Sequence, residues 1–363
     1  MKPFENARHP VVLLGNGARD ADCAQFLNLG IPILSSWMAS DLVDNFDPNY
    51  FGRPGIYGQR CANTILHNAD TIIAVGNRCS IWNVGYEGFR KDQRLVMVDV
   101  DPAEAQRFPN AEFINCEAKK FVESTTFLPL PRYEWLDQCK AWRLAMPWYE
   151  PWMDNQCYIS PYRFMHRLQA WLRPDEIIVA DVGTANVCAQ QILRLKPPQR
   201  LMSSGGLGEM GCAFPAAIGA SFATGKGEVI CLQNDGGAMM NLQELQTIIT
   251  HKLPIKIILF SNDGYAMIRR SQQVLGYKES GVGAATGMSM PSFRMLAHSL
   301  GFSACEVRTW ADYEKEIPAL FSCPGPALVE VFTDPEQPFL KLNPIMVDGK
   351  VTSPAFDQLS PIL

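Results

Sequence analysis

Two stretches of sequence decide the fold class: 229–237, which reads VICLQNDGG, and 255–264, which reads IKIILFSNDG. Each is a short, continuous apolar run that stops at a polar or glycine-rich turn. Such runs are typical of parallel strands that are buried on both faces, because a strand with one wet face alternates apolar and polar residues. The same pattern occurs at 177–184 and 327–334, so we predict four parallel strands in this half of the chain.

The N-terminal part of the chain shows the same pattern. Apolar runs at 11–14, 31–34, 71–75 and 95–98 alternate with stretches of helical spacing such as 19–29. Strands that alternate with helices indicate a doubly wound sheet, in which ligands bind at the carboxyl ends of the strands. We therefore predict an α/β protein with two doubly wound parallel-sheet domains, the first of them Rossmann-like.

A region rich in proline and tryptophan separates the two predicted domains. Prolines interrupt it, whereas its four tryptophans argue against a disordered tether and favour a helix around 134–144. The predicted organisation is a first domain at 8–120, a linker with a Trp-rich helix at 121–160, a second domain at 161–335 and an extended C-terminal tail at 336–363.

Composition excludes several classes of protein. The 363 residues contain 32 Lys+Arg and 37 Asp+Glu, a net charge of −5, which argues against a polybasic binder of nucleic acid or membranes. No apolar run approaches the roughly 18 residues that a membrane span requires, and residues 1–6 show no signal peptide. The 11 cysteines are scattered without a C-x-x-C pair, as expected for free thiols in the cytoplasm. We expect a cytoplasmic enzyme.

Polar residues at two neighbouring strand ends are suited to a cation and an anionic ligand. Asp235 supplies a carboxylate oxygen and Asn262 an amide oxygen, both of which suit Mg²⁺. Gly236 and Gly237 would let backbone N–H groups approach a phosphate. Asp-Gly-Gly alone is also an ordinary turn, so the argument rests on the combination.

That combination resembles the fingerprint of thiamine-diphosphate (ThDP) enzymes, which runs from Gly-Asp-Gly to Asn-Asn. Asn234 stands in place of the first Gly and Ser261 in place of the first Asn. The segments 204–211 (SGGLGEMG) and 215–220 (PAAIGA) are similar to acetolactate synthase. The first domain resembles the central domain of that family at 15–18 (GNGA), 76–78 (GNR) and 99–102 (DVDP), so the likeness covers residues 8–335.

The resemblance implies a role for each matching residue. Asp235, the side chain of Asn262 and the backbone carbonyl of Gly264 would bind Mg²⁺. Met210 would lie under the centre of the cofactor, and the carbonyl of Gly208 would accept a hydrogen bond from its amino group. The implied cofactor-binding set is Gly183, Thr184, Ala185, Gly208, Met210, Asp235, Gly236, Gly237, Asn262, Gly264, Tyr265 and Ala266.

The resemblance also implies the reaction and a partner. Bound ThDP would supply the carbon nucleophile that attacks a 2-oxo acid, pyruvate, before carbon dioxide leaves and the two-carbon unit is transferred to a carbonyl acceptor. Family members carry a preceding pyrimidine-binding domain with an activating glutamate, and no matching segment occurs in this sequence. We therefore assign no catalytic residue and expect a hetero-oligomer in which a separate chain supplies that domain.

Three other readings remain open: a two-subunit 2-oxo acid decarboxylase, a non-catalytic regulatory paralogue, and a nicotinamide dehydrogenase that uses the first domain. FAD is not expected, because 79–82 (CSIW) replaces the acidic pair of flavin-binding members. Ser271 stands where acetolactate synthase has a tryptophan, which leaves room for a different acceptor. Arg269 and Arg270 either bind a carboxylate or phosphate or lie exposed on a helix.

Overall fold

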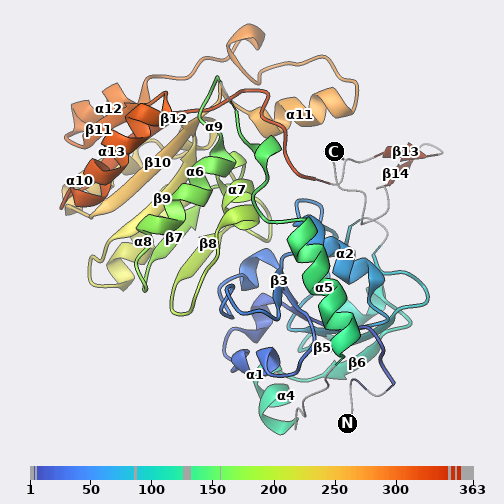
Figure 1. Cartoon of the computed structure of the whole chain (residues 1–363). Helices are drawn as coiled ribbons and strands as arrows, with labels where there is room; N and C mark the ends of the chain where they lie inside the picture. The colour runs from blue at the N-terminus through green and yellow to red at the C-terminus, as the bar shows by residue number, and fades with distance from the viewer. Residues whose placement is uncertain are drawn as a thin grey trace. The chain divides into compact units, whose positions relative to one another are not determined.

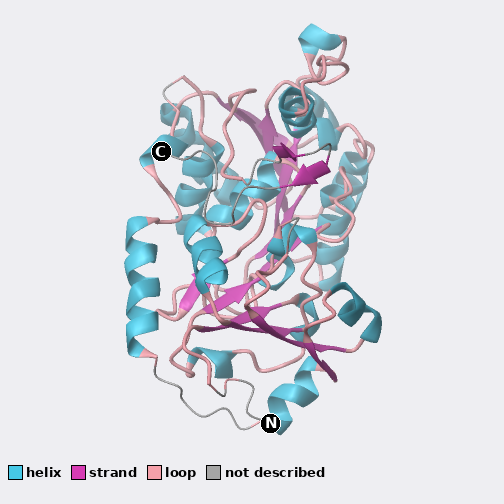
Figure 2. Ribbon diagram, turned by 90° about the vertical axis from the view of Figure 1, so that its right-hand side faces the viewer, coloured by secondary structure: helices cyan, strands magenta, loops and turns pink. Residues whose placement is uncertain are grey.

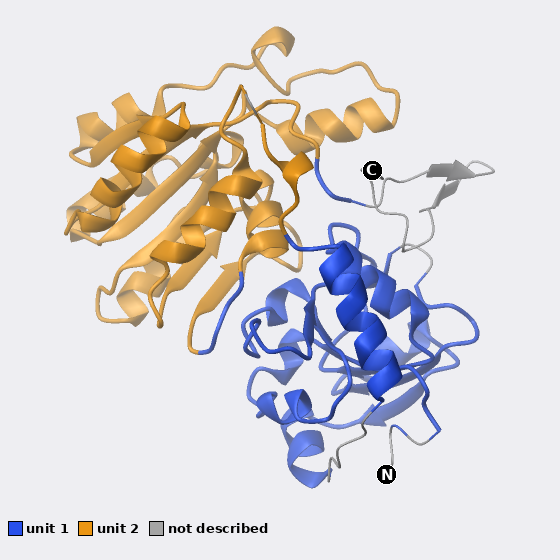
Figure 3. Ribbon diagram, in the orientation of Figure 1, with its two compact units in different colours: residues 1–148, 194–197, 339–363 blue, residues 149–193, 198–338 orange. Residues whose placement is uncertain are grey.

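The computed structural model describes residues 4, 6–85, 88–125, 132–155, 157–341, 345–347 and 350–352. The chain divides into two compact units, which Figure 3 shows in different colours. Unit 1 comprises 1–148, 194–197 and 339–363, and unit 2 comprises 149–193 and 198–338. Each unit is built on its own six-stranded parallel sheet; the apolar runs predicted that the sheets are parallel and predicted four strands of each.

The sheet of unit 1 has the strand order β3-β2-β1-β4-β5-β6. Figure 1 labels β3, β5 and β6 of this sheet. The chain reverses its direction of progress across the sheet between β1 and β4, which is the switch point of a doubly wound fold. The strands are β1 Pro10–Leu14, β2 Ile33–Ser35, β3 Tyr50–Gly52, β4 Thr71–Val75, β5 Arg94–Asp99 and β6 Glu112–Asn115.

Alternate residues of the central strands serve the two faces of this sheet. Val12 and Ile73 belong to one core cluster, with Phe121 of α4, while Val11 and Ile72 belong to the other. Because both faces are covered, both sets of side chains are apolar and the strands read as continuous runs. The helices are α1 Ala24–Leu27, α2 Arg60–Asn68, α3 Ile81–Val84, α4 Ala118–Ser124 and α5 Tyr133–Ala145.

The sheet of unit 2 has the order β11-β12-β10-β9-β7-β8, with its switch point between β7 and β9. All of its strand pairs are parallel. The strands are β7 Ile177–Ala180, β8 Arg200–Ser203, β9 Val229–Asn234, β10 Ile255–Ser261, β11 Ser303–Val307 and β12 Ala327–Phe332.

Helices cover both faces of the second sheet as well; Figure 2 colours helices and strands separately. Phe214 of α8, Ile248 of α10 and Phe293 of α12 pack on one face with Ile257. On the other face, the ring of Phe164 in α6 lies 5.3 Å from that of Phe260. The helices are α6 Pro161–Leu168, α7 Thr184–Ile192, α8 Ala213–Ala223, α9 Asp235–Ala238, α10 Glu244–His251, α11 Ala266–Val274, α12 Phe293–Leu300 and α13 Trp310–Ser322.

The structure adds four strands that the apolar runs did not predict, β3, β6, β8 and β11, and all four lie at sheet edges. The helix expected around 134–144 is α5. Of the predicted linker at 121–160, residues 126–131 and 156 lie outside the described residues. Much of the predicted tail at 336–363 also lies outside them, although β13 (Ile345–Val347) and β14 (Lys350–Thr352) form an antiparallel pair.

Candidate functional site

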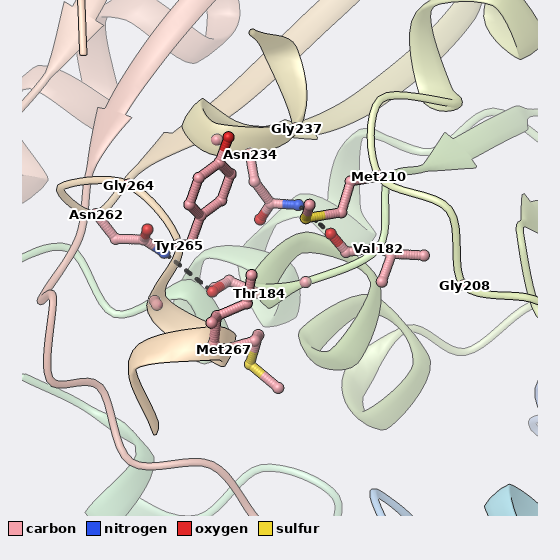
Figure 4. Close-up of a pocket in the computed structure, with 14 residues that line it drawn as sticks. Val182, Thr184, Gly208, Met210, Asn234, Gly237, Asn262, Gly264, Tyr265 and Met267 are labelled. Atoms are coloured by element: carbon pink, nitrogen blue, oxygen red, sulfur yellow. Dashed lines mark hydrogen bonds between the residues drawn. The ribbon is translucent and has the colours of Figure 1, made fainter. Parts of the chain in front are cut away.

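A cavity of about 320 Å³ opens at the carboxyl ends of β7, β9 and β10 (Figure 4). This edge of the sheet includes the switch point of unit 2, where ligands of doubly wound proteins bind. The cavity falls within the size range of small-molecule sites, about 300–1,000 Å³. Its lining comes from Val182, Gly183, Thr184, Gly208, Met210, Asn234, Gly236, Gly237, Asn262, Gly264, Tyr265, Ala266, Met267 and Ile268.

Most of the predicted cofactor-binding residues meet in this cavity. Of the twelve, only Ala185 and Asp235 are not part of its lining. Four lining residues were not predicted: Val182, Asn234, Met267 and Ile268. Val182, Asn234 and Met267 each adjoin a predicted residue in the sequence, so adjacency was the available signal, whereas Ile268 lies one residue further into α11.

Asp235 lies between the lining residues Asn234 and Gly236 in the sequence and is fully buried. Its Oδ2 accepts the backbone N–H groups of Asn262 at 2.9 Å and Gly264 at 2.8 Å, and its Oδ1 accepts that of Gly236 at 2.8 Å. Burial nevertheless raises the pKa of the Asp235 carboxyl to about 6. The carboxylate therefore fastens the end of β10 to the end of β9 and keeps a negative charge beneath the cavity.

The side chain of Asn262 brings three oxygen-bearing groups together. One atom of its terminal amide lies 3.2 Å from Asp235 Oδ1 and 3.1 Å from the carbonyl oxygen of Gly264, and the other lies 3.0 Å from Thr184 Oγ1. With nitrogen toward Asp235, the amide donates to both oxygens. With oxygen toward Asp235, three oxygens converge, and Nδ2 donates to the Thr184 hydroxyl, which is the contact dashed in Figure 4.

Without a cation, the first orientation satisfies the hydrogen bonds of the amide, whereas the oxygens that converge in the second orientation would fit a small divalent cation. Adjacent ligands of an octahedral Mg²⁺ lie about 3 Å apart, because each sits about 2.1 Å from the ion. The separations of 3.2 and 3.1 Å match this geometry. Among the described residues, no group of three His, Cys, Asp or Glu side chains could hold a metal. A cation here would therefore rely on Asp235, the amide of Asn262 and the carbonyl of Gly264.

Asn234 replaces the first glycine of the fingerprint and ties β9 to the start of α7. Its Oδ1 accepts the N–H of Ala185 at 2.9 Å, and its Nδ2 donates to the carbonyl of Val182 at 3.1 Å. The N–H of Ala185, a residue of the predicted cofactor-binding set, is thus directed at Asn234. Thr184, Gly236 and Gly237 remain in the lining at the place where a diphosphate would lie.

Asp181 holds the loop that carries Met210. Its Oδ2 accepts the N–H of Gly211 at 3.0 Å and its Oδ1 accepts that of Ala213 at 3.3 Å, and burial raises the pKa of its carboxyl. A Cβ atom at Gly237 would lie 1.9 Å from Asp181 Oδ2, so only glycine fits there. Asp181 therefore sets Met210 beside the ends of β7 and β9.

Apolar side chains from α11 and the loops form the rest of the wall. Met267 and Ile268 line the cavity at the start of α11, together with Val182 and Met210. Ser271 is exposed, and its hydroxyl donates to the carbonyl of Met267 at 2.9 Å. Ser271 is therefore not part of the lining of the cavity, although it is hydrogen-bonded to the lining residue Met267.

The two arginines of α11 have different surroundings. Arg269 is buried and donates to backbone carbonyls, including that of Asp263 at 2.7 Å. Arg270 is exposed, and its described contact is with Gln273 at 3.5 Å. The suggestion that both arginines lie exposed on a helix is therefore wrong for Arg269, whose guanidinium group is already bound to the protein.

Comparison with known proteins defines the class of the protein. The model of the central domain of thiamine pyrophosphate enzymes matches residues 1–124, and that of their C-terminal TPP binding domain matches 181–331. The chain belongs to the thiamine pyrophosphate enzyme family, and these two domains imply ThDP as the cofactor.

Within that family, the relatives of the chain are acetolactate synthase large subunits. It is 31% identical over 353 residues to acetolactate synthase isozyme 1 large subunit of Escherichia coli (strain K12), covering 94% of this chain and 61% of the relative. It is 28% identical over 344 residues to the acetolactate synthase large subunit of Pyropia yezoensis, covering 91% and 58%. The chain thus spans about three fifths of the length of these relatives.

Among the described residues, none of the helices is both long and apolar enough to cross a membrane.

Proposed function

We propose that this chain binds ThDP and Mg²⁺ as part of an acetolactate synthase-like carboligase. The substrate would be a 2-oxo acid, pyruvate, and the product would arise by transfer of the acyl anion equivalent to a carbonyl acceptor. The observation that carries the proposal is the convergence of Asp235, Asn262 and the Gly264 carbonyl at the edge of the cavity. The 11 cysteines are free, and free thiols persist in a reducing compartment, which supports a cytoplasmic location.

The chain's own residues would bind the cation and the cofactor and would shield the reacting carbonyl from water. Asp235 and Asn262 with the Gly264 carbonyl would hold the cation, and the Thr184 hydroxyl would bind the other atom of the Asn262 amide in that arrangement. When bound, ThDP supplies a carbon nucleophile and an electron sink for decarboxylation. Met210, Met267 and Ile268 would exclude water from the reacting carbonyl because they present apolar surface to the cavity.

The proposal includes a second chain that carries the pyrimidine-binding domain and its activating glutamate. Support comes from apolar side chains near the cavity that are exposed on the described chain: Leu207 (89%), Met239 (42%) and Met240 (46%). Met240 adjoins Gly211, since a Cβ atom at Gly211 would lie 2.6 Å from the Met240 Cβ. Exposed apolar surface of this kind is typical of a protein interface.

The first experiment isolates the tagged chain from its native host with ThDP and Mg²⁺ and weighs the complex by native mass spectrometry. A hetero-oligomer with bound ThDP that converts pyruvate to a hydroxyketone would support the proposal. A homo-oligomer that turns over pyruvate would contradict the separate partner. An aldehyde product would indicate a decarboxylase, and a complex without ThDP would favour the regulatory paralogue.

A further inference from the structure

Arg269 is a buried arginine beside the candidate cation site that the proposed function leaves without a role. It is the fourth residue of α11, and its side chain is 6% exposed, whereas the neighbouring Arg270 faces solvent. A buried guanidinium is costly unless its donors are satisfied, so its contacts indicate what it stabilises.

The guanidinium of Arg269 joins three segments that are distant in the sequence. It donates to the carbonyls of Asp263 at 2.7 Å, Val282 at 3.2 Å and Pro335 at 3.0 Å. Carboxylates of Asp263, Glu279 and Glu336 lie 3.5–4.0 Å away and offset its charge. The planar group has five N–H donors in a fixed arrangement, which a lysine ammonium cannot reproduce.

These contacts hold the bend that carries the Gly264 carbonyl. Asp263 has a φ of 61°, a left-handed conformation that is uncommon for a residue other than glycine and needs support from its surroundings. The Val282 carbonyl, besides accepting from Arg269, accepts the N–H of Tyr265 at 2.9 Å. On the opposite side of the bend, the N–H of Gly264 donates to Asp235 Oδ2 at 2.8 Å.

We propose that Arg269 is a positioning residue that holds the bend at 263–265, and with it the Gly264 carbonyl, in the geometry required by the cation. Asp235 holds the bend from the cavity side and Arg269 holds it from behind. The inference rests on the proposed role of Gly264 as a cation ligand. Mutation of residues that orient metal ligands typically lowers metal affinity by about 10- to 100-fold.

The test compares Arg269→Gln with Arg270→Gln, which removes the same charge from the adjacent, exposed position. In the native complex, the Mg²⁺ concentration that gives half-maximal ThDP binding is measured by calorimetry. We expect it to rise by about 10-fold or more in Arg269→Gln and to stay unchanged in Arg270→Gln. At saturating Mg²⁺, ThDP affinity should return to the wild-type value, because the diphosphate contacts are intact.

A second measurement does not depend on the cofactor. In the metal-free complex, hydrogen exchange of the peptide that contains Asn262 and Gly264 should be faster in Arg269→Gln only, with the rest of unit 2 unchanged. Arg269→Lys, which keeps the charge, should show a smaller effect and replaces Arg269→Gln if that variant does not fold.

Three outcomes would overturn the inference. Arg269→Gln could show the hydrogen exchange and the Mg²⁺ dependence of the wild type, or Arg270→Gln could change both as much as Arg269→Gln does. In the third, exchange in Arg269→Gln would be faster across all of unit 2. If the wild-type complex binds no ThDP, the proposed function fails, whereas the exchange experiment still decides whether Arg269 holds the bend. The two failures are therefore distinguishable.

Discussion

The two sheets use an asparagine in the same way at their switch points. In unit 1, Asn77 follows β4 and its Nδ2 donates to the carbonyl of Leu14 at the end of β1, at 3.0 Å. In unit 2, Asn234 ends β9 and its Nδ2 donates to the carbonyl of Val182 after β7, at 3.1 Å. Both contacts bridge two adjacent parallel strands across the point where ligands of such folds bind.

The surroundings of these asparagines differ. In unit 1, the N–H groups of Gly15 and Gly17 donate to the carbonyls of Val75 and Gly76, at 2.9 and 3.0 Å. A Cβ atom at Gly15 would lie 2.1 Å from the Gly76 oxygen, so the two loops touch. In unit 2 the corresponding edge holds a cavity with a buried carboxylate beneath it. One architecture thus yields a closed edge or a binding site according to the loop residues, and the predictions below test that difference.

The largest effect is expected at Asp235. Asp235→Asn removes the charged oxygen and turns an amide N–H₂ group toward backbone donors, so Mg²⁺-dependent ThDP binding should weaken by about 100-fold or more. Calorimetric titration of the native complex measures this. Asp99→Asn, at the end of β5 in unit 1, is the matched control and should bind normally. Binding within a few-fold of wild type in Asp235→Asn would remove Asp235 from the site.

A substitution at the closed edge of unit 1 should change the free energy of unfolding and not ThDP binding. Gly15→Ala places a methyl group against the Gly76 carbonyl, and overpacking of this kind costs about 1–3 kcal/mol of unfolding free energy. Urea unfolding measures the loss, and ThDP binding should be retained. In Gly206→Ala the added Cβ meets nothing within 4 Å, so this control in unit 2 should be near neutral. Equal losses in both variants would contradict the contrast.

The pH dependence of stability should also distinguish the units. Burial raises the pKa of Glu176, Asp181 and Glu330 in unit 2, whereas hydrogen bonds from Arg90 and Arg94 lower the pKa of Asp92 and Glu112 in unit 1. A raised carboxyl pKa gives stability that is lost as pH rises through the folded-state value, and a lowered one gives stability that is lost as pH falls.

Metal-free unit 2 should therefore become less stable relative to unit 1 as pH rises from about 4 to about 7. Peptide-resolved hydrogen exchange, corrected for intrinsic rates, measures the opening free energy in each unit. The effect should be modest, because hydrogen bonds partly offset the burial of these groups. Parallel pH profiles in the two units would show that burial does not govern these carboxyl groups.

The smallest effect, a change in tryptophan fluorescence, is expected when flavin or nicotinamide nucleotides are added. The N–H groups of Gly15 and Gly17 donate to the carbonyls of Val75 and Gly76, so they are not available to a pyrophosphate. Quenching of tryptophan fluorescence by FAD or NADH should show no saturable phase in the native complex. A saturable phase that is lost in Gly15→Ala would show that the edge of unit 1 opens and binds a nucleotide.

The central strands were readable from the sequence, whereas the edge strands were not. Strands buried on both faces are apolar at most positions, so β4 and the first four residues of β9 appear as continuous runs. An edge strand meets solvent and need not be apolar: β6 and β11 are largely exposed or half-buried, and β3 has only three residues. Edge strands are recruited by the neighbouring strand, which is a tertiary effect.

The sequence by itself determined the fold class and the set of chemical groups at the site, because the polar ends of parallel strands meet at one sheet edge whatever the loops do. Tertiary structure decided which groups face the cavity. It placed Asn234 in the lining, directed the N–H of Ala185 at Asn234, and buried Arg269 behind the bend at 263–265. Orientation and burial depend on partners distant in the chain, such as Val282 and Pro335 for Arg269, and no local pattern specifies those partners.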